Sequence, residues 1–302
     1  MSDRPSNSSA PLATPADVKR ITVQSLASDP LLAERLVFKG GSALEMLYGI
    51  GLRASVDLDY SIQGDFDDAE IDRIKQSLSH TLSAAFGRIG VAIFDLHFEP
   101  KPRNVSPDLA AFWGGYQIRF KLIDRRLAEA IGDDPQSLRR SALAVGPAQR
   151  RTFEIDISRH ECCQDKELHT FGGVAVLAYS PRLIVAEKLR AICQQMPEYR
   201  KSVRSPGSSP RARDFFDIHN LLDQFNLVLA TREFLSLLTA VFQAKRVSLD
   251  SLPHITGTRE FHRQDFQSVL DTVPPRLAVL TFDEYFDSVL SLVRDLQALR
   301  DE

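Results

Sequence analysis

Phe38-Lys39-Gly40-Gly41-Ser42-Ala43-Leu44 decides the fold of this chain, together with Arg53-Ala54-Ser55-Val56-Asp57-Leu58-Asp59 shortly after it. The apolar run at 36–38 predicts a short buried strand. Two glycines and a serine then lead into a segment with helical spacing at 43–48, and the alternating stretch 56–60 predicts a second strand. We therefore expect a strand, a glycine-rich turn, a helix and a returning strand at the centre of the fold.

The returning strand carries a pair of carboxylates. Side chains two positions apart on a strand point to the same face, so Asp57 and Asp59 are expected to project together. Two carboxylates held so close repel each other, and a divalent cation relieves that repulsion. The alternative for an isolated Asp-x-Asp is a solvated edge strand. Ser55 shares the face of Asp57, either to contact phosphate or metal-bound water or as an ordinary surface serine.

The glycine-rich turn suits a phosphate, because glycine allows close backbone approach and amides at a helix start attract anions. Gly41 and Ser42 would meet the β- and γ-phosphates through their amides and the hydroxyl; the alternative is a helix N-cap without a ligand. A P-loop is excluded because no Lys-Ser or Lys-Thr follows at the required spacing. A phosphate cradle beside metal-binding carboxylates indicates phosphoryl or nucleotidyl transfer.

The stretch 152–158 supplies a third carboxylate. Its alternation predicts a strand with Glu154 and Asp156 on one face and apolar residues on the other. We expect Asp156 to join Asp57 and Asp59, with Glu154 as the alternative. Asp156 is also expected to help remove the proton from the attacking hydroxyl.

Helices after residue 180 supply the cations. Lys188 lies in a helical stretch that begins at Pro181, and Asp214 lies in a strongly amphipathic helix at 211–222. Lys188 and Arg213 are expected to hold the triphosphate, with Asp214 orienting one of them. The ordinary alternatives are a lysine that reaches solvent and a first-turn acid at a helix start.

Three further features have weaker claims to a function. His160-Glu161-Cys162-Cys163 lacks a second ligand pair at zinc spacing, so a metal site there is not expected. His219 is expected on a helix surface or in the core rather than as a catalytic base. A basic loop at 197–210 either receives a phosphodiester backbone or is a solvated loop. Its cations and those just after it are Arg200, Lys201, Arg204, Arg211 and Arg213.

Composition limits the class of protein. The 302 residues are 43% apolar, enough for a sizeable core, and the net charge of -3 means that any nucleic-acid surface must be a local patch. Three cysteines fit a reducing compartment, and neither a membrane span nor a signal peptide is expected, so we predict a cytoplasmic protein. The expected organisation is a disordered tail at 1–15, an α+β lobe with a mixed sheet at 16–178, and a helical lobe at 179–302.

Five motifs in order carry a family resemblance: Phe-Lys-Gly-Gly-Ser-Ala-Leu, Arg-x-Ser-x-Asp-x-Asp, Glu-x-Asp-x-Ser, Glu-Lys-Leu-x-Ala and Arg-Asp-Phe-Phe-Asp. From about residue 37 to 222 the chain resembles the AbiEii/AbiGii nucleotidyltransferase toxin family, MenT-like toxins included, within the DNA polymerase β-like superfamily. By position, the resemblance assigns the nucleotide-binding turn to Gly41 and Ser42, the metal pair to Asp57 and Asp59, the third acid to Asp156, and the two later motifs to Lys188 and Asp214.

The resemblance implies a polymerase-β-like fold and transfer of a nucleotide from an NTP, dependent on Mg²⁺ or Mn²⁺. It further implies RNA as acceptor, with the tRNA 3′ end as the expected target, a block of translation, and a cognate antitoxin encoded nearby. Two alternatives stay open: transfer to a protein or a small molecule such as an antibiotic, and an inactive nucleotide-binding interaction protein. The NTP used, the oligomeric state and the role of residues 225–302 also stay open.

Overall fold

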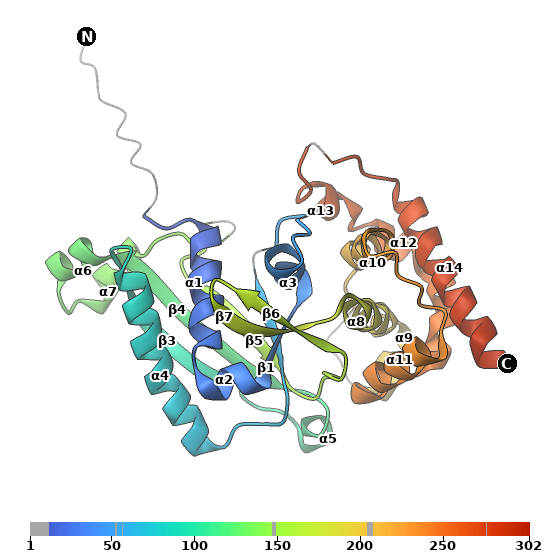
Figure 1. Cartoon of the computed structure of the whole chain (residues 1–302), viewed down its shortest axis with the longest axis horizontal. Coiled ribbons are helices and arrows are strands. Elements are labelled where there is room, and N and C mark those ends of the chain that lie inside the picture. The colour runs from blue at the N-terminus through green and yellow to red at the C-terminus, as the bar shows by residue number, and fades with distance from the viewer. Residues whose placement is uncertain (1–11, 52, 56, 147–148, 204–207, 276) are drawn as a thin grey trace, which may run out of the picture.

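The computed structural model describes residues 12–51, 53–55, 57–146, 149–203, 208–275 and 277–302 (Figure 1). Most of the predicted N-terminal tail, and Arg204 of the basic loop, lie outside these residues. The tail was expected to reach residue 15, next to the start of the first helix. Pro15 already belongs to a helix, and Thr14 caps that helix through a hydrogen bond from the Asp17 amide.

A seven-stranded sheet forms the centre of the described chain, in the order β3-β4-β5-β2-β1-β7-β6. The strands are β1 (Leu36–Lys39), β2 (Leu58–Ile62), β3 (Val91–Lys101), β4 (Gly115–Asp124), β5 (Phe153–Ser158), β6 (Lys166–Phe171) and β7 (Val174–Tyr179). The pairs β2–β5 and β1–β7 are parallel and the other neighbours are antiparallel, so the sheet is mixed, as predicted.

Helices precede, interrupt and follow the sheet (Figure 1). Those before β5 are α1 (Pro15–Ala27), α2 (Pro30–Arg35), α3 (Gly40–Leu47), α4 (Asp68–Gly87), α5 (Pro107–Ala110), α6 (Arg125–Ile131) and α7 (Pro135–Ser141). Those after β7 are α8 (Pro181–Cys193), α9 (Pro197–Ser202), α10 (Ala212–Gln224), α11 (Arg232–Ala244), the 3₁₀ helix η2 (Leu249–Thr258), α12 (Arg259–Arg263), α13 (Phe266–Leu270) and α14 (Phe282–Asp301).

Local sequence signals explain most of these boundaries. Ser180 caps α8 by accepting a hydrogen bond from the Leu183 amide, as predicted, and Pro135 is the first residue of a separate helix, a position that suits proline. Two boundaries differ from expectation. α9 lies inside the predicted loop 197–210, and β2 begins at Leu58, so Asp57 immediately precedes the strand.

The two faces of the sheet have different covers. One face carries apolar side chains that pack against α1 and α4, as in the contact between the rings of Phe86 and Phe120. On the other face, Val37 and Tyr179 of β1 and β7 belong to a core shared with α8, α10, α11 and α14. These later helices gather at the β1–β7–β6 end of the sheet, away from β3 and β4 (Figure 1). The second face is therefore covered at one end and polar at the other.

Candidate active site

A row of polar side chains crosses five strands on the second face of the sheet. In the antiparallel β1–β2 pair Lys39 lies opposite Asp59, and in the parallel β2–β5 pair Asp59 lies opposite Asp156. Gln117 continues the row on β4, where its Nε2 donates to Asp156 Oδ1 at 3.0 Å, and Glu99 follows on β3. Strand pairing thus places Asp156, rather than the alternative Glu154, beside Asp59.

The surroundings of Asp59 disfavour the charged form of its carboxyl. Burial is the main cause that raises the pKa of Asp59 to about 6, and the charges of Asp156, Glu187 and Asp57 raise it further, against the opposing effect of Lys39. A carboxylate whose negative neighbours disfavour its charged form is one that a cation would stabilise.

Basic side chains contact the other two carboxylates. Lys101 Nζ donates to both oxygens of Asp156, at 2.7 and 2.9 Å, and Arg150 Nη1 lies 3.9 Å from Asp57, whose side chain is 69% exposed. As placed, no three acidic, histidine or cysteine side chains of the described chain are grouped closely enough to hold a metal ion. The donors themselves fit Mg²⁺, because carboxylate oxygens are the ligands this hard cation prefers.

The glycine-rich turn packs directly on this row. Gly40 has φ +77°, and a Cβ there would lie 3.1 Å from Asp59 Oδ2. A Cβ at Gly41 would lie 2.9 Å from Ser55 Oγ, so a side chain there would force Ser55 or the turn to move. Ser42 Oγ donates to the Asp57 carbonyl at 2.7 Å. The first-turn amides of α3 have no side-chain cap from Lys39, so the helix start keeps its affinity for an anion.

Contacts from separate elements hold residues 53–55, which lie just before Asp57. The Ala54 amide donates to the carbonyl of Thr272, which follows α13, and Lys19 of α1 donates to the Ser55 carbonyl at 2.9 Å. Arg53 donates to both carboxylate oxygens of Asp217 on α10, at 3.0 and 2.8 Å. The C-terminal region, which carries no recognised motif, therefore takes part in fixing the candidate site.

A buried chain of charges runs from that segment into the helical region. Lys188 Nζ donates to Asp217 Oδ2 at 2.7 Å and to Asp214 Oδ1 at 3.0 Å, and Asp214 also contacts Arg211. Burial would raise the pKa of the Asp214 carboxyl, but Arg211 and Lys188 outweigh it and hold that pKa well below its usual range. With Arg53, this group of buried charges has three cations for two carboxylates, a local excess of positive charge.

The expected roles in this region need one correction. The predicted pair of Lys188 and Asp214 exists, but the arginine that contacts Asp214 is Arg211, while Arg213, two positions later, is exposed. Lys188 does not reach for solvent, because its side chain is buried between the two aspartates.

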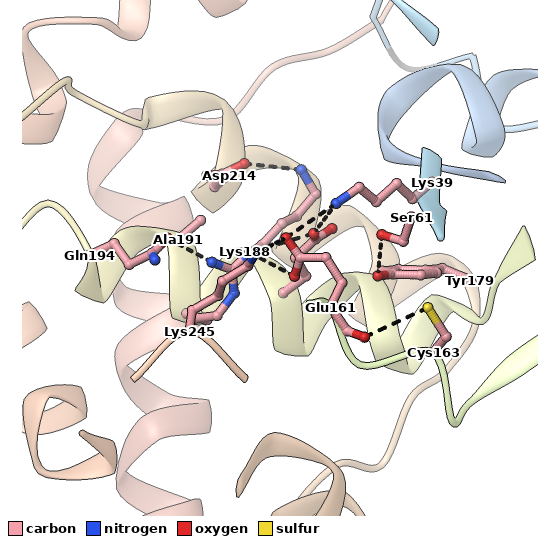
Figure 2. A network of polar contacts seen from close by, with 12 residues as sticks. Lys39, Ser61, Glu161, Cys163, Tyr179, Lys188, Ala191, Gln194, Asp214 and Lys245 are labelled. Carbon is pink, nitrogen blue, oxygen red and sulfur yellow. Dashed lines mark hydrogen bonds and ion pairs between the residues drawn. The ribbon is translucent and has the colours of Figure 1, made fainter. Parts of the chain in front are cut away.

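A second buried network lies beside the row (Figure 2). Glu161 faces Lys39 at 3.8 Å, Arg190 at 3.7 Å and Lys245 at 3.2 Å, and Lys39 also pairs with Glu187 at 2.6 Å. The three cations hold the pKa of Glu161 down to about 2, although burial opposes them. The Glu161 carboxylate of the 160–163 motif thus serves as an internal counter-ion.

The remaining side chains considered above have ordinary surroundings. His219 packs edge-on against Tyr285, with ring centroids 5.2 Å apart. Cys163 is buried and its thiol, whose pKa burial raises to about 11, lies 3.8 Å from the Glu161 carbonyl. No helix in the described part of the chain is long and apolar enough to cross a membrane.

Comparison with known proteins identifies the family. A family model described as the nucleotidyl transferase AbiEii toxin of type IV toxin–antitoxin systems matches residues 23–290. The chain belongs to the AbiEii family. It is thus a nucleotidyltransferase of a toxin–antitoxin family, and its α+β fold, with a mixed sheet followed by helices, is the one predicted.

Solved structures and curated proteins add less information about this chain than the family model does. The crystal structure of JHP933 from Helicobacter pylori is 17% identical, covers 95% of this chain and 92% of its own, and has a TM-score of 0.46. An antigenic nucleotidyltransferase-like protein from Paracoccidioides brasiliensis is also 17% identical, over 84% of this chain and 94% of its own, with a TM-score of 0.34. No curated protein matches the sequence.

The sequence alone did not reveal several residues at the site of this AbiEii family member. Asp217 had a signal, because it lies one helical turn after Asp214 and so shares its face. Arg53 stands in the Arg-x-Ser-x-Asp motif but had been given no role. Lys39 likewise stands in the Phe-Lys-Gly-Gly motif but had been given no role. Glu161 had no signal, since its neighbours come from distant parts of the sequence.

Proposed function

We propose that this AbiEii protein transfers a nucleotide from an NTP to an RNA acceptor, with the tRNA 3′ end as the expected target. The transfer would block translation in the cytoplasm, and a cognate antitoxin would neutralise it. The observation that carries the proposal is the pairing of Asp59 with Asp156 directly beside the uncapped start of α3. It combines what nucleotidyl transfer requires, a carboxylate set and an anion site, in one place.

The carboxylates Asp57, Asp59 and Asp156 would hold Mg²⁺ or Mn²⁺. When bound, the metal neutralises charge on the triphosphate and orients it for attack. Lys101 and Arg150 now contact Asp156 and Asp57, and these exposed ion pairs are weak enough to exchange for a stronger cation.

The triphosphate would lie at the start of α3, where the amides of Gly41 and Ser42 face it. Lys188 is fixed between Asp214 and Asp217. Arg53, which also pairs with Asp217, is the cation of this group next to the turn, since its Nη2 lies 3.5 Å from the Cβ position of Gly41. Ser55 packs against the same glycine and would orient the turn. Arg213 is exposed and would reach the outer phosphates.

The reaction is a substitution at the α-phosphorus. The acceptor hydroxyl oxygen forms a bond to this phosphorus while the bond to the bridging oxygen breaks, and pyrophosphate leaves. Asp156, on the β5 side of Asp59, would accept the hydroxyl proton. Because attack and departure are in line, a leaving group at α3 requires the acceptor to approach from the β5 side.

Incubation with each radiolabelled NTP, total RNA and total protein tests the proposal. We expect the wild type to label RNA, and Asp57→Ala to abolish labelling while its circular dichroism spectrum stays unchanged. Asp72→Ala, which removes an exposed carboxylate of α4, is the matched control and should label RNA as the wild type does. Labelled protein without labelled RNA, full activity of Asp57→Ala, or nucleotide binding without transfer would each refute the proposal.

A further inference from the structure

The open half of the second sheet face has a composition unlike the rest of the chain. Its side chains on β3, β4 and β5 are polar, whereas the same strands bury apolar side chains against α4 on the other face. An antiparallel sheet often leaves one face in water, so polarity alone would not be informative. The balance of charge on this face is more informative.

Cations on this face outnumber the acids that remain once a metal ion neutralises Asp57, Asp59 and Asp156. The cations there and at its rim are Lys101, Arg103, Arg119, Lys121, Arg139 and Arg150, and the remaining acids are Asp95, Glu99 and Glu154. With its metal bound, this patch would therefore have the opposite sign to the net charge of -3 of the whole chain.

Two acids on this face are each shared by two cations. Glu99 accepts from both Arg103 and Arg119, at 2.8 and 3.0 Å. Asp95 is likewise shared by Lys121 and Arg139, at 3.4 and 2.7 Å. Each acid therefore leaves one positive charge in excess and fixes the positions of both cations.

Lys101 joins this face to the candidate site. Its side chain is 49% exposed and holds Asp156, which is 43% exposed. If Asp156 turns to a metal ion, the Lys101 ammonium loses its partner at the point where the acceptor must arrive. An incoming phosphate is the natural replacement, because a charge-assisted hydrogen bond to phosphate restores what the lysine loses.

We propose that the open face of β3, β4 and β5 binds the phosphodiester backbone of the acceptor, with Lys101 and Arg119 as its central contacts. The proposal rests on the proposed function, since in-line attack brings the acceptor over this face. It assigns binding to residues outside the five sequence motifs, and it makes a polyanion, rather than a protein or a small molecule, the acceptor that fits.

Equilibrium binding of a 5′-fluorescein-labelled RNA hairpin with a single-stranded 3′ end tests it. Fluorescence anisotropy with Mg²⁺ present and without NTP reads the surface independently of catalysis, because no nucleotide is available for transfer. Lys101→Ala and Arg119→Ala should each weaken binding about threefold at physiological salt and reduce the slope of log affinity against log salt by about 0.7, the loss of one phosphate contact.

Matched controls lie on the other side of the sheet. Lys75 of α4 is 46% exposed and pairs with Asp72, and Arg20 of α1 pairs with Asp17, so Lys75→Ala and Arg20→Ala remove comparable cations. Both should leave affinity and slope unchanged. Asp156→Asn frees Lys101 without removing it and should tighten RNA binding.

Unchanged affinity and slope in Lys101→Ala and Arg119→Ala would overturn the proposal, as would an equal loss in the controls or unchanged or weaker binding by Asp156→Asn. Its failure is distinguishable from failure of the proposed function. Wild-type protein that labels RNA, while both variants bind the hairpin normally, refutes only the surface; wild-type protein that labels no RNA refutes the function.

Discussion

Removal of the Asp217 carboxylate should destabilise the protein strongly. This buried group accepts two hydrogen bonds from Arg53 and one from Lys188, and together with Asp214 it balances three cations. In Asp217→Ala, this group of buried charges would keep its three cations but only one carboxylate. Breaking a buried ion pair by removing one partner costs about 3–5 kcal/mol, because the remaining charge stays desolvated.

Urea unfolding followed by far-UV circular dichroism measures this loss. A cost of that size should lower the unfolding midpoint by about 1 M urea, since the dependence of stability on urea is about 3 kcal/mol per molar for a chain of this size. Asp72→Ala removes an exposed carboxylate paired with Lys75 and should cost less than about 0.5 kcal/mol.

A double-mutant cycle separates the ion pair from other effects. Arg53→Met removes one of the cations left unpaired, so Asp217→Ala combined with Arg53→Met should lose less stability than the two single variants added together. A cost below about 1 kcal/mol for Asp217→Ala, or strictly additive costs, would contradict the view that this chain of charges holds the site segment to α10.

Three further outcomes are expected. Gly41→Ala places a Cβ 2.9 Å from Ser55 Oγ and should cost about 1–3 kcal/mol by thermal unfolding, with partial recovery in Gly41→Ala combined with Ser55→Gly. Buried His262 accepts a hydrogen bond from the Arg211 amide, and burial lowers the pKa of its imidazole to about 4. Its stabilising contribution is therefore present above pH 6.5 and lost as the pH falls towards 4. In His262→Gln, the stability against urea should depend less on pH over that range, and an unchanged pH profile would contradict this. Glu161→Gln leaves three cations without their shared anion and should cost about 3–5 kcal/mol in urea unfolding, whereas a neutral effect would show that Glu161 is not their counter-ion.

Local patterns predicted the elements of the site well. The strand, glycine turn and helix at 36–47, the alternating face of β5 and the start of α8 were all predicted, because each depends on side-chain period, glycine, proline or capping within a few residues. The presence of Asp59 and Asp156 on polar faces followed from the same patterns.

Pairings between distant segments could not be predicted in this way. Nothing within β2 or β5 specifies that they run parallel with Asp59 opposite Asp156, because register is fixed by the whole sheet. The choice of Arg211 over Arg213 depends on where α10 begins. The Thr272 carbonyl that binds the Ala54 amide has no sequence signature at all, since every residue except proline carries the same backbone groups.

Parallel incubations with NTP labelled at the α-phosphate or at the γ-phosphate test the chemistry most directly. If the carboxylate row at Asp59 and Asp156 catalyses nucleotidyl transfer to RNA, the α-label should enter RNA and the γ-label should leave as pyrophosphate, with both signals lost in Asp59→Asn. Label from the γ-phosphate in RNA would mean phosphoryl transfer, and α-label incorporation that survives in Asp59→Asn would place the chemistry elsewhere in the molecule.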